Sequence, residues 1–315
     1  MAPIKLALVG LGKIARDQHL PAIAGTQGLE LSGIASRHAS VPNLAHWTTI
    51  DDMLASNADI DAVSLCTPPQ GRFAQAKAAL EAGKHLMLEK PPGATLSEVQ
   101  ALEALAKAKG LTLFATWHSR FASAVEEARA LLSNATIRSV TIEWKEDVRH
   151  WHPGQEWIWQ PGGLGVFDPG INALSIVTRI LREKFYLTQS DLFFPENRAA
   201  PIAANLDFEL TGGATLRAEF DWRQTGPQTW DIRVETDAGQ IVLSQGGNVL
   251  TVNGTEQAHP SGQKREDREY RSLYGRFMQL MAAGRSDVDL SPLTHVADAF
   301  MLGNRHAVET FEDTP

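Results

Sequence analysis

The chain has 315 residues, a length of about two domains that can bury a core without a metal or a disulfide. Apolar residues make up 43% and charged residues 21% of the sequence, which excludes a disordered chain. The formal charge of −8, without a run of Lys and Arg, argues against nucleic acid or an anionic membrane as a partner, and the single cysteine excludes an internal disulfide.

Signals for targeting and for metal binding are absent from the sequence. No stretch approaches the roughly 18 apolar residues that span a membrane, and the first residues lack a basic region followed by an apolar core. No H-E-x-x-H or C-x-x-C spacing occurs. We therefore expect a soluble, cytoplasmic protein with no membrane partner and no metal site.

The first third of the chain alternates between strand-like and helix-like stretches. The apolar runs predict strands at 4–9, 30–35, 62–66, 85–89 and 111–115, and the stretches between them predict helices at 73–82 and 97–109. Strands that alternate with helices of this length form βαβ units around a parallel sheet that is buried on both faces. We expect this α/β Rossmann domain to occupy residues 1–120.

After a predicted helix at 122–132 the pattern changes to period two. Alternating apolar and polar residues, separated by short turns that contain glycine, predict strands at 139–146, 205–210, 215–222, 230–236, 240–243 and 249–252. Further helices are predicted at 171–182, 270–283 and 293–310. We expect an α+β domain with a large, open, mainly antiparallel sheet over 121–292, and a C-terminal helix in 293–315 that packs back toward the first domain.

A glycine-rich loop, G-x-G-x-x-A, follows the first predicted strand. Gly10 permits a tight turn, and Gly12 lets a pyrophosphate approach the backbone where the next helix begins. Lys13 and Ile14 complete the loop before Ala15, which replaces the third glycine. A loop in this position predicts a dinucleotide site formed by Gly10, Gly12, Lys13 and Ile14.

The end of the second predicted strand bears on which dinucleotide is bound. An NAD site usually has an acidic residue here, for the ribose 2′-hydroxyl. This chain has Ser36 and Arg37 and no carboxylate; the guanidinium can pair with a 2′-phosphate and the hydroxyl can donate to it. We expect NADP as the preferred cofactor, with NAD accepted as an alternative.

Two Pro-Pro segments follow neighbouring strands: Cys66-Thr67-Pro68-Pro69 and Glu89-Lys90-Pro91-Pro92. With the glycine loop, they make the whole chain resemble the glucose-fructose oxidoreductase/inositol dehydrogenase family. Within it, the chain is similar to the bacterial aldose 1-dehydrogenases that act on L-arabinose and D-galactose. The segments that carry this similarity are 116–121, Glu146, 150–152 and 168–172.

The resemblance implies roles for both Pro-Pro segments. Cys66, Thr67, Pro68 and Glu89 would contribute to the cofactor site, and Lys90 would lie beside nicotinamide and substrate. Lys90 also has a physical argument of its own, because a cationic nicotinamide nearby loosens the proton of an ammonium group. Many family members carry His where this chain has Arg72, whose role the sequence leaves open.

A second departure from the family concerns the catalytic base. The family pattern is an Asp followed four residues later by a His, whereas this chain has Asp168 and Asn172. On a helix these two residues share a face. An amide cannot accept a proton as imidazole does, so the base would be Asp168, Lys90 or the two as a pair, and Asn172 would orient the sugar.

The remaining candidates are substrate ligands. His118, Glu146 and His152 could bond sugar hydroxyls, and Trp151 and Trp230 could stack on the C–H face of a pyranose. The substrate set is completed by the residues already discussed, Lys90, Asp168 and Asn172.

These residues predict an NAD(P)-dependent oxidoreductase that oxidises the anomeric carbon of L-arabinose, D-galactose or both to the lactone. Two alternatives stay open: an inositol or polyol dehydrogenase on the same fold, which would yield a ketone, and an NADP-binding sensor without turnover. The partner expected is a small sugar, and the open sheet could pair two copies into a homo-oligomer.

Overall fold

The protein folds as two compact units, which a computed structural model describes for residues 2–56, 58–258 and 265–312. The first unit comprises Met1–His118 and Glu266–Asp289, and the second comprises Ser119–Arg265 and Leu290–Pro315. The chain therefore returns to the first unit after a long excursion. The predicted second domain, 121–292, includes 266–289, but this segment packs in the first unit, where Phe277 stacks on Phe114 with ring centres 6.3 Å apart.

The sheet of the first unit confirms the predicted Rossmann fold. In the described residues its six strands are all parallel, in the order β3-β2-β1-β4-β5-β6. Their bounds are β1 Ile4–Val9, β2 Leu29–Ala35, β3 Ala45–Trp47, β4 Ala62–Leu65, β5 His85–Leu88 and β6 Leu113–Ala115. The order of strands reverses between β1 and β4, the point where such sheets bind ligands beyond the carboxyl ends of the strands.

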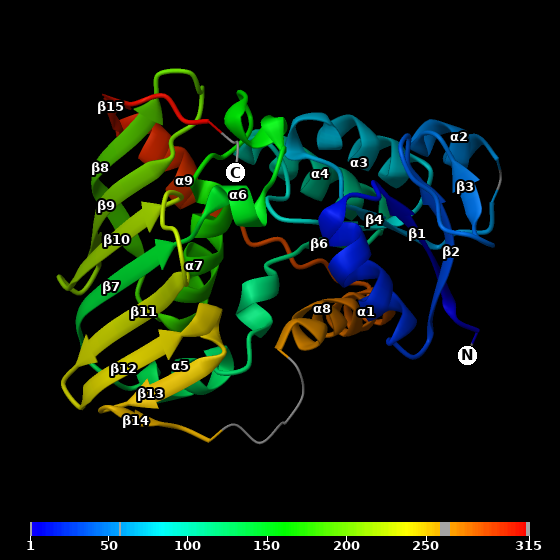
Figure 1. Cartoon of the computed structure of the whole chain (residues 1–315). Helices are drawn as coiled ribbons and strands as arrows, with labels where there is room; N and C mark the ends of the chain where they lie inside the picture. Colours follow the sequence, from blue (N-terminus) through cyan, green and yellow to red (C-terminus); the bar gives the residue numbers. More distant parts are fainter. Residues whose placement is uncertain (1, 57, 259–264, 313–315) are drawn as a thin grey trace. The chain divides into compact units, whose positions relative to one another are not determined.

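Helices cover the first unit's sheet on both faces (Figure 1). They are α1 Leu20–Ala24, α2 Ile50–Ala55, α3 Arg72–Glu81, α4 Leu96–Lys109 and α8 Arg265–Ala282. A π-helical turn at Ala15–His19 leads into α1, so that 13–24 is one continuous helical segment. The short elements β3 and α2 were not predicted, because three to six residues give too little periodicity to detect.

The second unit confirms the predicted open sheet. Within the described residues it has nine strands in the order β14-β13-β12-β11-β7-β10-β9-β8-β15, and only the pairs β7–β10 and β8–β15 are parallel. The bounds are β7 Ile137–Lys145, β8 Phe185–Pro195, β9 Ala203–Leu210, β10 Thr215–Asp221, β11 Thr229–Thr236, β12 Gly239–Ser244, β13 Val249–Val252, β14 Thr255–Glu256 and β15 Asn304–Val308.

One face of this sheet is apolar and lies under α5 Val125–Leu132, α7 Phe167–Ile180 and α9 Ser291–Leu302. Along β7, Val140, Ile142 and Trp144 are buried on that face. The opposite face carries ion pairs such as Lys145 with Glu219, whose charged atoms are 2.8 Å apart. This alternation is the reason the strands could be recognised from their sequence.

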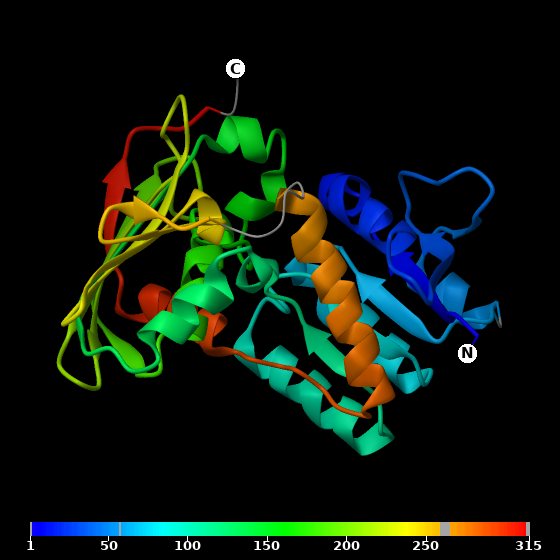
Figure 2. The ribbon, with the colours of Figure 1, turned by 90° about the horizontal axis from the view of Figure 1, so that it is seen from below.

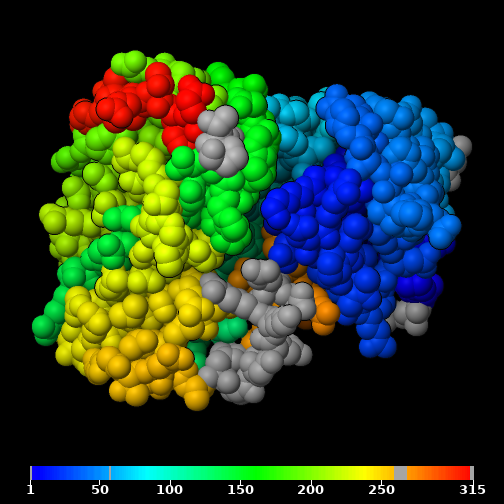
Figure 3. All heavy atoms as spheres, in the orientation of Figure 1, coloured from blue at the N-terminus to red at the C-terminus, as the bar shows by residue number. Residues whose placement is uncertain are grey.

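The C-terminal segment differs from its prediction in two respects. The helix α9 ends at Leu302, and Asn304–Val308 forms the edge strand β15 beside β8, seen in red at the surface in Figure 3. The helix packs on α7 and β8 of its own unit, where His295 stacks on Phe185 with ring centres 4.2 Å apart. The pairing of β15 with a strand more than a hundred residues earlier leaves no local signal in the sequence.

No helix in the described part of the chain is both long enough and apolar enough to cross a membrane.

Candidate functional site

The glycine loop is held tightly between two strand ends of the first unit. Gly10 has φ 87°, and its N–H donates to the carbonyl of Ala35 at the end of β2 (2.9 Å). A Cβ at Gly10 would lie 2.9 Å from Cγ2 of Thr67, which follows β4. Both the backbone conformation and the close approach therefore require glycine here.

The loop leaves room where a pyrophosphate would lie. A Cβ at Gly12 would meet no protein atom within 4 Å, and the carbonyl of Gly12 already accepts a helical bond from the N–H of Arg16 (3.1 Å). Ile14 exposes 38% of its surface, which is unusual for a large apolar side chain, and Lys13 pairs with Asp17. Open space at a helix start suits a dinucleotide, so the residues present fit the predicted cofactor.

The end of β2 has no carboxylate, as the sequence indicated. The N–H of Ser36 donates to the carbonyl of Trp47 (2.9 Å), and the Ser36 carbonyl lies 2.9 Å from Nε2 of His46. Arg37 is exposed. Gly10 of the glycine loop bonds to Ala35, the residue just before Ser36 and Arg37. Ser36 and Arg37 therefore lie at the same edge of the sheet as the loop.

The structure gives Arg72 a role that the sequence left open. Its side chain is 2% exposed, its Nε donates to the carbonyl of Thr67 (3.0 Å), and its Nη1 donates to the carbonyls of Glu89 and Pro91. The guanidinium thus ties the loop after β4 to the loop after β5. These are the two Pro-Pro loops, and one of them carries Lys90.

The Glu89 carboxylate is engaged inside the first unit. It is bonded by the hydroxyl of Tyr270 (2.6 Å), lies 3.3 Å from Nε2 of His19, and accepts from the backbone N–H of Lys90. Burial raises the Glu89 pKa, but His19, His118 and Lys90 outweigh it and hold the pKa at about 2.

His118, at the end of the first unit, also faces α8. Its Nδ1 lies 2.8 Å from Oε2 of Glu269, and its ring stacks on Tyr270 with centres 5.4 Å apart. Glu269 and Tyr270 were not predicted as site residues, because α8 carries no motif and lies within the predicted second domain.

In the second unit the structure brings three of the predicted residues together. Asp168 lies in the first turn of α7, 2% exposed, with its Oδ2 3.4 Å from Nε2 of His152. Asn172 follows one turn later on the same helix. The N-cap residue of this helix is Val166, and Asp168 lies within the first turn.

Glu146 and the tryptophans form a second group there. The two carboxylate oxygens of Glu146, a residue 3% exposed, accept from Nε1 of Trp222 (3.2 Å) and Nε1 of Trp230 (2.8 Å). Trp151 lies against Trp230 with ring centres 5.2 Å apart. Trp222, which sequence analysis did not single out, also contacts the ring of His152, 5.3 Å away, and so joins the two groups.

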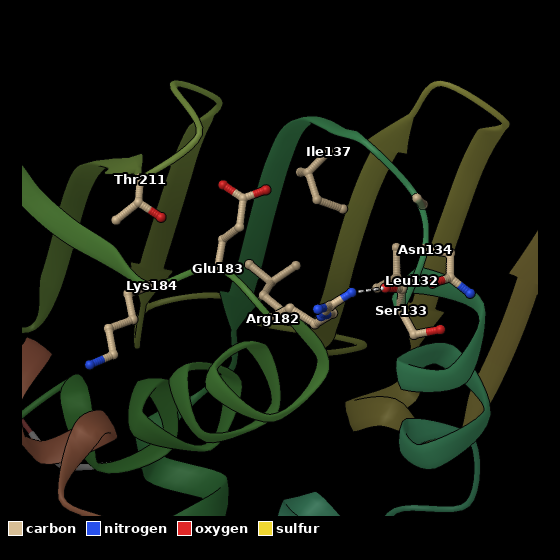
Figure 4. Close-up of a pocket in the computed structure, with 10 residues that line it drawn as sticks. Leu132, Ser133, Asn134, Ile137, Arg182, Glu183, Lys184 and Thr211 are labelled. Carbon is tan, nitrogen blue, oxygen red and sulfur yellow. Dashed lines mark hydrogen bonds between the residues drawn. The ribbon is translucent and has the colours of Figure 1, made fainter.

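Two hollows of the second unit lie elsewhere. The one in Figure 4 has a volume of about 600 Å³ and is lined by residues at the start of β7, before β8 and in the β9–β10 turn. Beside it, Arg182, which precedes β8, donates to the carbonyl of Ser133, which precedes β7 (2.8 Å). The other, of about 540 Å³, lies on the polar face of the sheet. Because Glu146 follows the carboxyl end of β7, the hollow in Figure 4 is at the opposite end of that strand.

Comparison with known proteins identifies relatives along the whole chain. Residues 4–116 match the oxidoreductase family GFO/IDH/MocA, described as an NAD-binding Rossmann fold. A galactose 1-dehydrogenase of Pseudomonas fluorescens is 42% identical over 313 residues, covering 99% of this chain and all of that protein. The crystal structure of a D-galactose 1-dehydrogenase protein from Rhizobium etli is 59% identical, covers 99% of both chains and has a TM-score of 0.93.

A more distant structure shares the fold alone. An inositol dehydrogenase homologue of Azotobacter vinelandii is 20% identical, covers 95% of this chain and 94% of its own, and has a TM-score of 0.81. The relatives that match over their full length, together with the glycine loop and the parallel sheet, establish that this chain belongs to the GFO/IDH/MocA family of NAD(P)-binding oxidoreductases.

Proposed function

We propose that the protein is an aldose 1-dehydrogenase that oxidises D-galactose, and also L-arabinose, to the lactone. The observation that carries this is the 59% identity, across nearly the whole of both chains, to a protein called a D-galactose 1-dehydrogenase. The polar and aromatic cluster of the second unit supports it, because buried carboxylates beside indoles suit a ring with many hydroxyls.

The reaction removes a hydride from C1 of the sugar and a proton from the hydroxyl on C1. A bound nicotinamide cofactor supplies the hydride acceptor. In this proposal Lys90 exchanges the proton with the C1 hydroxyl, and Asp168 tunes that exchange and binds the sugar. His152 lies beside the Asp168 carboxylate and would fix its orientation toward the substrate.

The sugar would be bound through its hydroxyls and its apolar face. In this proposal Glu146, whose carboxylate accepts from two indoles, also accepts from a sugar hydroxyl. Those same bonds orient Trp230, which with Trp151 offers a surface for the C–H face of a pyranose. His118 and Asn172 complete the proposed set of hydroxyl ligands.

NADP preference is also part of the proposal, with NAD accepted more weakly. It is supported by exposed Arg37 and by Ser36 at an edge that has no carboxylate. Association of two copies through the polar face of the open sheet stays a proposal, tested by light scattering.

A panel of sugars with each cofactor tests the function. D-galactose and L-arabinose share the ring configuration at C2 to C4, so both should reduce the cofactor, whereas D-glucose, the C4 epimer, should be poorer by as much as roughly 10⁴-fold. Hydroxylamine trapping should report a lactone. A ketone product would favour a polyol dehydrogenase, NADP binding without turnover would favour a sensor, and glucose turning over as fast as arabinose would exclude readout of the C4 hydroxyl.

A further inference from the structure

A buried polar cluster in the first unit is not explained by the proposed chemistry. His19 of the segment 13–24 lies 2.7 Å (Nδ1) from the hydroxyl of Tyr274 and 3.3 Å (Nε2) from the carboxylate of Glu89. Tyr270 donates to the same carboxylate, and Tyr274 donates to Ser64 (3.3 Å). All five residues are at most 3% exposed. Figure 2 shows α8, in orange, beside the blue segment that follows β1.

Burying such a cluster is unfavourable for the free energy of folding. Removing a carboxylate and an imidazole from water carries a large desolvation penalty, and an apolar pair of similar volume often packs at such a place without loss of stability. Stability alone therefore gives no strong reason to place charge at Glu89 and His19.

The Glu89 carboxylate also contacts the backbone of Lys90. Oε2 of Glu89 accepts from the Lys90 N–H, while Oε1 is held by Tyr270 and His19. On the other side of Glu89, Arg72 holds the carbonyls of Glu89 and Pro91. The peptide group before the Cα of Lys90 is thus held at both its carbonyl and its N–H, and the backbone is held again at the Pro91 carbonyl. These contacts on both sides of Lys90 restrict the direction in which its side chain leaves the loop.

We propose that Glu89 is a positioning residue for Lys90, held in place by His19 and Tyr270, so that the helical segment after the glycine loop and α8 together aim the lysine. This inference rests on the proposed role of Lys90 in the reaction. A reacting group displaced by about 1 Å can lose 10²-fold in rate. Loss of the Glu89 carboxylate should therefore lower turnover without a comparable loss of cofactor or sugar binding.

The first test is Glu89→Gln, which keeps the shape and removes the charge. We expect kcat with D-galactose to fall about 100-fold, while KM for the sugar and NADPH affinity by fluorescence titration stay within about threefold. Glu98→Gln is the matched control, because Glu98 also accepts from a backbone N–H, that of Ala94 (3.1 Å), outside the cluster. The control should keep wild-type kcat. A normal kcat in folded Glu89→Gln protein would overturn the inference.

A double-mutant cycle separates positioning from a merely structural role. In a Lys90→Ala background, Glu89→Gln should lower the residual kcat no further, because there is no lysine left to aim. Additive losses would overturn the inference.

If Glu89→Gln fails to fold, Tyr270→Phe takes its place in the same cycle. It removes one donor to Glu89 and leaves the charges, so kcat should fall about tenfold, as loss of one bond to a charged group would give, and only when Lys90 is present. A Tyr270→Phe kcat equal to wild type would overturn the inference. Wild-type protein without sugar turnover would instead overturn the proposed function, and this inference with it.

Discussion

At the scale of single residues, Asp168 and Lys90 have different claims to the role of base. Asp168 lies 2% exposed beside His152, and a carboxylate can accept a proton but is intrinsically a weak base. Lys90 is intrinsically far more basic and must first lose its own proton, which a cationic nicotinamide favours. Asn172 can donate and accept hydrogen bonds but cannot take up a proton.

Substitutions at these residues should therefore have distinct kinetic signatures. Lys90→Ala should lower kcat by roughly 10²–10⁴-fold, the usual cost of losing a general base, with the cofactor still bound. Asp168→Asn should lower both kcat and sugar affinity, and Asn172→Ala should mainly raise KM for the sugar. Steady-state kinetics with D-galactose make the comparison. Near-normal kcat in Lys90→Ala together with loss of activity in Asp168→Asn would assign the base to Asp168.

The cofactor preference is carried by Arg37. Arg37→Asp replaces a partner of a 2′-phosphate by a like charge, so KM for NADP should rise far more than KM for NAD. The measurement is KM for both cofactors in wild type and variant. Unchanged ratios of the two constants would remove Arg37 from the cofactor site.

At the scale of elements, the buried cluster joins four segments of the chain. It links 13–24, β4, the end of β5 and α8 through bonds that span 70 to 255 residues. Burial lowers the His19 pKa, yet Cys66, Tyr274 and Glu89 outweigh it, so that the pKa is raised well above its usual value. The Glu89 pKa is held at about 2. Both shifts stabilise the charged forms of the pair.

The two shifts predict opposite pH limits for the stability that the pair contributes. The Glu89 part should be present above its ordinary value of 4.5 and lost as the pH falls toward 2; the His19 part should be present below 6.5 and lost as the pH rises through its raised pKa. His118, Lys90 and Tyr270 also face Glu89 and contribute to its environment.

Urea unfolding from acid to alkaline pH can check this prediction. The reference is the double variant His19→Gln, Glu89→Gln, which is neutral and keeps hydrogen-bonding groups. The stability difference between wild type and this variant should be largest between pH 4.5 and 6.5 and smaller on either side. A difference that is independent of pH would mean that the pKa values of the pair are the same in the folded and the unfolded protein, and would contradict the prediction.

At the scale of the whole molecule, the two units have different tasks in the proposal. The first contains the glycine loop and the strand ends that suit a dinucleotide, and the second contains Glu146, Asp168 and the indole cluster. The chain passes from one unit to the other at three places, after residues 118, 265 and 289.

This division of tasks predicts separate footprints in hydrogen exchange. NADP should slow exchange at 10–16, 36–37 and 66–67, the segments of the proposed cofactor site, because binding opposes their local opening. D-galactose added to the NADP complex should slow exchange at 146–152 and 168–172, and a sugar that is not turned over should leave these peptides unchanged. Protection by galactose in the first unit alone would contradict a sugar site built from the second.

The sequence by itself determined those features that depend on local patterns of residues. The glycine loop, five of the six parallel strands of the first unit and most strands of the second follow from spacing and periodicity within a few residues, because burial on one or both faces imposes that periodicity. The family motifs also led to Lys90, Asp168 and Asn172, and the structure places Asp168 and Asn172 one helical turn apart.

Only the tertiary structure decided which distant segments meet. The membership of α8 in the first unit, β15 at the edge of the second sheet, and the contacts of Arg72 and Glu89 depend on pairings up to more than a hundred residues apart. Such a contact constrains one residue at each end and imposes no period on the residues around it. A lone Arg, His or Tyr therefore looks the same in sequence whether it lies in solvent or fixes the backbone of a proposed catalytic lysine.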